Sequence, residues 1–148
     1  MSTLGERLGS GEKRHQILDD ACRVLDEEVA DKSGLGGLAV KAAYAVVKGI
    51  KPGFIRQAVD HLLDEFLDIM SVFADEAAQK NVKPGALILD NRAKVANALL
   101  AVTDRRAQKA ESGVVRKSYD KLRPSAQKHV EAATPRLAQL LDKHTAPN

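Results

Sequence analysis

The chain has 148 residues, of which 44% are hydrophobic, 29% are charged and only 3% are aromatic. This length and balance suit one globular domain and exclude a disordered chain. Alanine and leucine, both strong helix formers, together supply 39 residues, which favours an all-α protein. A single cysteine, Cys22, excludes an internal disulfide. The most apolar stretch, residues 35–50, is shorter than the roughly 20 residues of a membrane-spanning helix.

The net charge of +3 is distributed unevenly along the chain. Residues 1–89 contain 11 Lys/Arg and 14 Asp/Glu, whereas residues 90–148 contain 12 and 6. The basic second half is therefore where an anionic partner is expected. The first ten residues lack the apolar core of a signal peptide, and together with the lone cysteine this indicates a cytoplasmic protein.

The N-terminal part is predicted to be a flexible leader followed by a helix. Residues 1–11 carry three glycines and no periodic pattern, so we expect them to be the leader. From about Glu12 to Asp31, apolar residues such as Leu18 and Leu25 recur at helical spacing, and Ser33-Gly34 ends this helix.

A second helix, over about residues 38–49, is predicted to lie at the centre of the bundle. It is apolar on most sides, interrupted only by Lys41 and Lys48, which lie seven residues apart on one side. Because a helix that is apolar all round is normally buried all round, we expect its other side chains to form the core.

Two further helices are predicted before residue 110. The spacing of Ile55, Leu62 and Phe73 by threes and fours predicts a long helix over Phe54–Lys80. Leu87–Leu89 is interpreted as a hydrophobic plug or a helical turn. A fourth helix begins after a cap at Asp90 or Asn91 and runs to about Lys109, and Arg106 lies in phase with its apolar side. Arg106 is expected either to extend its guanidinium to solvent or to pair with a carboxylate of another helix.

After Gly113, apolar residues recur at helical spacing as far as His144, across two prolines, Pro124 and Pro135. Each proline removes a helical amide donor, so the segment is either one kinked helix or successive short helices. The sequence thus predicts a single compact bundle of five to six helices over residues 12–144, with proline-interrupted C-terminal helices and a disordered tail at 145–148.

Two stretches, residues 32–55 (KSGLGGLAVKAAYAVVKGIKPGFI) and residues 115–130 (VRKSYDKLRPSAQKHV), resemble a family of small all-helical proteins of actinobacteria and related soil bacteria whose function is unassigned. The resemblance extends over about residues 18–144. It implies a bacterial origin and one small domain, and it transfers no active site.

Four patterns were weighed as chemical sites. Glu12 and His15 have the E-x-x-H spacing of half a di-iron site, but no second such pair exists, so no metal or other cofactor is predicted. The cluster of His61, Asp64, Glu65 and Asp68 fits a solvated acidic face better than an acid–base pair. Cys22 fits a small buried thiol, and Gly34–Gly37 a turn more than a phosphate loop. No catalytic residue is therefore predicted.

The strongest functional pattern is a basic segment over residues 105–128. Its candidate anion-binding residues are Arg105, Arg116, Lys117, Lys121, Arg123 and Lys128. Such a face fits either a solvated surface or a site for nucleic acid or another polyanion, and it lacks the side chains that read bases.

The sequence favours a non-catalytic cytoplasmic interaction or scaffold protein, acting through a protein partner or self-association. A non-sequence-specific nucleic-acid or polyanion binder using residues 105–128 is the first alternative. A helical protein that binds a small apolar ligand or a metal is the second.

Overall fold

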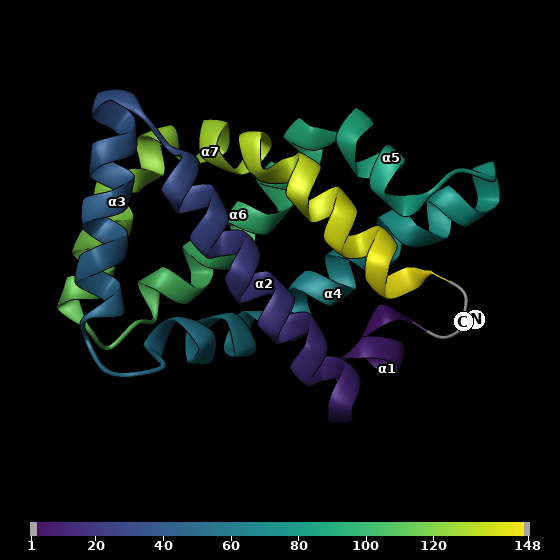
Figure 1. The fold of residues 1–148 in the computed structure, drawn as a ribbon, viewed down its shortest axis with the longest axis horizontal. Helices are drawn as coiled ribbons and strands as arrows, with labels where there is room; N and C mark the ends of the chain where they lie inside the picture. The colour runs from purple at the N-terminus through teal and green to yellow at the C-terminus, as the bar shows by residue number, and fades with distance from the viewer. Residues whose placement is uncertain (1–2, 147–148) are drawn as a thin grey trace.

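The computed structural model describes residues 3–146, which form seven helices and no strand (Figure 1). The prediction of an all-α fold is confirmed. The helix number is higher than the predicted five to six, because two short helices, α1 (Leu4–Leu8) and α5 (Pro84–Asp90), add to the longer ones. Of the predicted tail, Thr145 ends the last helix, and residues 147–148 lie outside the described residues.

Three of the long helices have nearly the bounds that the hydrophobic spacing predicts. They are α2 (Gly11–Asp31), α4 (Phe54–Lys80) and α6 (Arg92–Gln108). Asn91 precedes α6 as predicted, but its side chain does not cap that helix. Instead its amide Nδ2 donates to the carbonyl oxygen of Leu87, 2.8 Å away, and so closes the end of α5.

The prediction that residues 1–11 form a flexible leader is wrong for α1. Leu4 and Leu8 lie one turn apart and are each only 2% exposed, within the core cluster. The hydroxyl of Thr3 accepts from the amide of Glu6 at 3.1 Å, and the amide of Leu4 donates to Ser71 Oγ of α4 at 2.9 Å. The cap and two buried leucines hold this short helix against α4.

The core is built by six of the seven helices. Its buried cluster takes side chains from α1, α2, α4, α5, α6 and α7 (Gly113–Thr145), including Ile88 of α5 and Val95 of α6, both fully buried. Thr134 of α7 is also fully buried, and its hydroxyl donates to the Val130 carbonyl at 3.2 Å. A buried hydroxyl that is hydrogen-bonded in this way avoids the cost of an unpaired polar group.

The prediction that the second long helix is the central element is wrong. This helix, α3 (Gly34–Lys48), lies at one end of the molecule (Figure 1), and none of its described side chains belongs to the core cluster. Val40 is buried, but Leu38 is 64% and Val46 53% exposed. Four of the apolar residues of this helix are alanines, whose small side chains gain little free energy on burial, and the larger side chains of other helices form the core.

The C-terminal segment is one helix, α7, which contains both Pro124 and Pro135 and bends along its length (Figure 1). Of the two alternatives that the prolines left open, a continuous bent helix is the one found. The hydroxyl of Ser125 donates to the Leu122 carbonyl at 3.2 Å, next to the first proline. Helix α7 packs on α2, α3, α5 and α6, and is thus the common partner of the bundle.

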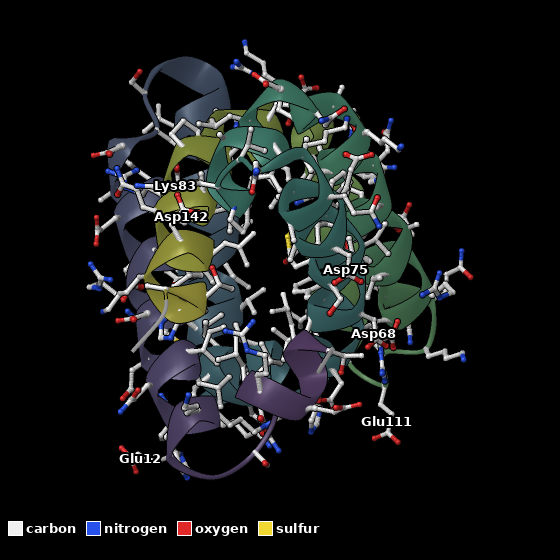
Figure 2. The ribbon with its side chains drawn as sticks, turned by 90° about the vertical axis from the view of Figure 1, so that its right-hand side faces the viewer. Glu12, Asp68, Asp75, Lys83, Glu111 and Asp142 are labelled. Carbon is white, nitrogen blue, oxygen red and sulfur yellow. The ribbon has the colours of Figure 1, made fainter. Side chains whose placement is uncertain are left out.

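Helix α5 lies unusually close to α7 at Gly85. An added Cβ at Gly85 would lie 2.7 Å from the Ala138 carbonyl oxygen and 2.4 Å from Asp142 Oδ2. The carboxylate of Asp142 accepts from the Gly85 amide at 2.8 Å, where the positive end of the α5 dipole favours an anion. Figure 2 shows Asp142 of α7 beside Lys83, the residue that precedes α5.

Gly85→Ala is expected to destabilise the protein by about 2 kcal/mol or more, because the methyl group must displace backbone as well as Asp142. Gly36→Ala is the matched control. A Cβ there meets nothing within 4 Å, so we expect unchanged or slightly higher stability. Urea unfolding of both variants measures the difference, and equal stabilities would contradict the close approach of α5 and α7.

Candidate functional site

Two of the basic residues in the 105–128 segment bind α6 to α4. Glu65 of α4 accepts from Arg105 Nη2 at 2.9 Å and from Arg106 Nη2 at 2.6 Å. Both hydrogen bonds lower the pKa of Glu65, and the bond from Arg105 has the larger effect. Of the two arrangements expected for Arg106, pairing with a carboxylate of another helix is confirmed.

Arg123 belongs to a network that joins α6 to α7. Its guanidinium donates to Asp104 Oδ1 at 2.8 Å, and the Tyr119 hydroxyl also bonds Asp104. Hydrogen bonds lower the pKa of Asp104, and the bond from Arg123 has a larger effect than that from Tyr119. Burial, and next the hydrogen bond to Asp104, raise the pKa of Tyr119 to about 12. Arg105 and Arg123 are therefore engaged by carboxylates of the same chain.

The remaining candidate cations lie on the first half of α7. Arg116 donates to the backbone carbonyl of Ala110. Lys117, Lys121 and Lys128 are exposed, and within residues 3–146 no carboxylate lies within salt-bridge distance of them. The predicted anion-binding set thus divides into residues that hold the fold together and three lysines open to solvent.

The candidate catalytic and metal residues are not assembled into a site. In the part of the chain that the structure describes, no three His, Cys, Asp or Glu side chains are grouped to hold a metal ion. Asp64 accepts from Arg14 Nη1 at 2.8 Å. Burial is the main cause that raises the pKa of Cys22, which keeps its thiol protonated at neutral pH.

Two open hollows mark the surface. One, of about 250 Å³, lies between α1, α4 and α5, and the other, of about 390 Å³, lies between α6 and α7 beside Tyr119. Both include charged residues in their lining, Arg7 and Asp75 in the first and Asp104, Arg116 and Asp120 in the second. The lining of the second hollow differs from the largely apolar walls of small-ligand pockets, whereas that of the first combines apolar residues with Arg7 and Asp75.

The surface feature that sequence reasoning missed is the outer face of α3. Four of its exposed apolar residues fall within one side of the helix at 100° per residue, and we call them the α3 stripe: Leu38, Ala42, Ala45 and Val46. Lys41 and Lys48 run along one edge of the stripe. The opposite side of α3 faces the protein, where Val40 is buried and the hydroxyl of Tyr44 bonds Asp26 of α2.

The charge around the α3 stripe has one sign. The chain contains no Asp or Glu between Asp31 and Asp60, but five Lys or Arg. Two of these are paired, Lys32 with Glu28 and Arg56 with Asp19. Lys41, Lys48 and Lys51 have no carboxylate within 4.0 Å among the described residues, and Lys48 Nζ lies 5.6 Å from the centre of the Tyr44 ring.

The first half of α7 lies alongside α3 at this end of the molecule (Figure 1). The pKa of His129 on α7 is lowered, mainly by burial and to a smaller extent by the nearby charges of Lys32 and Lys128. Glu28 of α2 pairs with both Lys32 and Arg136 of α7, so the start of α3 lies close to α7. The open lysines of α3 and α7 therefore belong to one region. The candidate functional site is therefore an apolar stripe bordered by cations.

Sequence comparison places the chain in a family. The model for the family of unknown function DUF6918 matches residues 4–145, and the chain belongs to that family. No curated protein and no solved structure matches the chain. Among the described residues, no helix is both long enough and apolar enough to cross a bilayer.

Asp104→Asn is expected to lower the free energy of unfolding at pH 7 by about 0.5–1 kcal/mol, a modest value because solvent partly screens the network. The folded-state pKa of Asp104 is below its usual 3.8, so the carboxylate stabilises the fold above that pH. The difference between variant and parent should therefore shrink as the pH falls below 3.8.

The matched control for this prediction is Asp120→Asn, an exposed carboxylate on α7 without an ion pair in residues 3–146. Its effect on urea unfolding at pH 7 should be small. Equal effects of the two substitutions would show that the Asp104 network does not join α6 to α7.

Proposed function

We propose that the protein is a non-catalytic interaction module that docks an acidic helix of a protein partner on the α3 stripe. The observation that carries this proposal is the exposure of Leu38 and Val46 on a helix whose only charged residues are lysines. Monomeric proteins rarely leave a contiguous apolar patch open unless it has a partner.

The chemistry of the stripe favours a helix as the occupant. Ala42 and Ala45 are small, so a partner helix can approach α3 at the short end of the usual interaxial distance of about 8–10 Å. Burial of Leu38 and Val46 would then contribute roughly 1–2 kcal/mol each, since both are already partly covered. Lys41 and Lys48 would meet carboxylates at the rim and select an acidic partner.

A membrane surface and a nucleic acid fit this region less well. Helices that lie in a lipid interface carry large side chains such as Trp, Phe and Leu, whereas two of the four residues of the stripe are alanines. A polyanion would use Lys117, Lys121 and Lys128 and leave the apolar stripe uncovered. The cytoplasmic setting and bacterial origin expected from the sequence are kept as part of the proposal.

The proposal predicts that an amphipathic peptide helix with leucine and alanine on one side and glutamate elsewhere binds at the α3 stripe. The control peptide replaces every glutamate with lysine and should not bind. In ¹⁵N NMR spectra, the acidic peptide should shift the amide signals of α3 and the adjoining first half of α7. Lys41→Glu/Lys48→Glu should weaken its binding at least about ten-fold, a change of about 1.4 kcal/mol.

A charge-matched control variant is Arg92→Glu/Lys94→Glu, whose side chains are exposed on α6 and lie outside α3 and α7. It should bind the acidic peptide as the parent does. Equal binding of both peptides, or shifts elsewhere on the protein, would contradict the proposal. Retention on duplex DNA and heparin that is lost in Lys117→Glu/Lys121→Glu/Lys128→Glu, without peptide binding, would support the polyanion alternative instead.

A further inference from the structure

The chain carries its own acidic helical surface, on the outer side of α4. Asp64, Asp68, Val72 and Asp75 fall within one side of that helix, and all are exposed; we call them the α4 stripe. Val72 is 67% exposed, more than any other large hydrophobic side chain that the structure describes. Figure 2 shows Asp68 and Asp75 on the same side of the molecule.

Helix α1 covers one edge of the α4 stripe, where the Leu4 amide donates to Ser71 Oγ, and away from that edge the carboxylates of the stripe are exposed. In residues 3–146, no cation lies within salt-bridge distance of Asp68 or Asp75. Asp64 pairs with Arg14, but its side chain remains 73% exposed. The α4 stripe is thus an apolar residue between open carboxylates, the reverse in charge of the α3 stripe.

The two stripes match in spacing as well as in sign. Lys41 and Lys48 lie seven residues apart on α3, and Asp68 and Asp75 lie seven apart on α4. At 1.5 Å per residue, both pairs span roughly 10 Å along their helices. Two helices laid side by side can therefore form both ion pairs at once. Val72, between the aspartates, would then meet the small side chains Ala42 and Ala45 between the lysines.

We propose that the partner helix on the α3 stripe is the α4 stripe of a second copy of this chain. This inference rests on the proposed function and names its partner. Pairing of α3 with α3 about a two-fold axis is disfavoured, because it would oppose lysines in a segment that has no acidic residue from 32 to 59.

The contact is head-to-tail, since each copy offers two different surfaces. Helix α3 lies at one end of the long axis, and the second half of α4 runs toward the other end (Figure 1). One copy can therefore hold a second while its other stripe stays open, which produces a concentration-dependent series of oligomers. A contact through one pair of helices is small, so the association is weak and is screened by salt.

Sedimentation velocity on the full chain tests this contact. At about 50 mM salt the average mass should rise with protein concentration, and it should fall back toward the monomer at about 500 mM. Lys41→Glu/Lys48→Glu and Asp68→Lys/Asp75→Lys should each remain monomeric, because like charges then face each other. An equimolar mixture of the two variants should associate again, since each variant restores the opposite charge to the other.

Arg92→Glu/Lys94→Glu, the control variant, should associate as the parent does. A parent protein that stays monomeric at low salt, association that survives either charge reversal, or a mixture that stays monomeric would each overturn the inference. A monomeric parent that still binds the acidic peptide on α3 would overturn only the identity of the partner. Loss of both peptide binding and self-association would overturn the proposed function as well.

Discussion

The close approach of α5 to α7 at Gly85 sets the geometry on which the remaining contacts depend. Only a residue without a side chain lets the α5 backbone come within reach of the Ala138 carbonyl and of Asp142. This contact places Ile88 in the core and fixes the C-terminal half of α7. Because α7 also packs on α2, α3 and α6, a shift at Gly85 would pass through the whole bundle.

Charge has two different roles in the molecule. Arg105, Arg106 and Arg123 hold α4, α6 and α7 together through Glu65 and Asp104. Once these three arginines are paired, the lysines of α3 and of the first half of α7 remain open to solvent next to the exposed apolar stripe. In the segment that resembles a polyanion site in the sequence, Arg105, Arg106 and Arg123 thus link helices, whereas its lysines on α7 are open.

The sequence predicts most of the helix bounds, because large apolar residues recur along α2, α4 and α6 and glycine or proline stands between these helices. It fails at α3 for a physical reason. A hydropathy pattern counts alanine as apolar, but burial free energy scales with area, and Leu and Ile side chains elsewhere outcompete it. The Glu65–Arg105 link joins residues 40 apart in sequence, so no local pattern reveals it. Two signals for the α3 face were present, namely lysines seven apart and the absence of acidic residues up to Asp60.

Amide hydrogen exchange, followed residue by residue in dilute protein at high salt, tests most directly whether α3 is a peripheral docking helix. The amides of α4, α6 and the second half of α7 should exchange slowest, because they surround Ile88 and Val95. Those of α3 should exchange much faster, and should slow when the acidic peptide is added. Protection of α3 equal to that of α6 in the free monomer would contradict this placement and would restore α3 to the core.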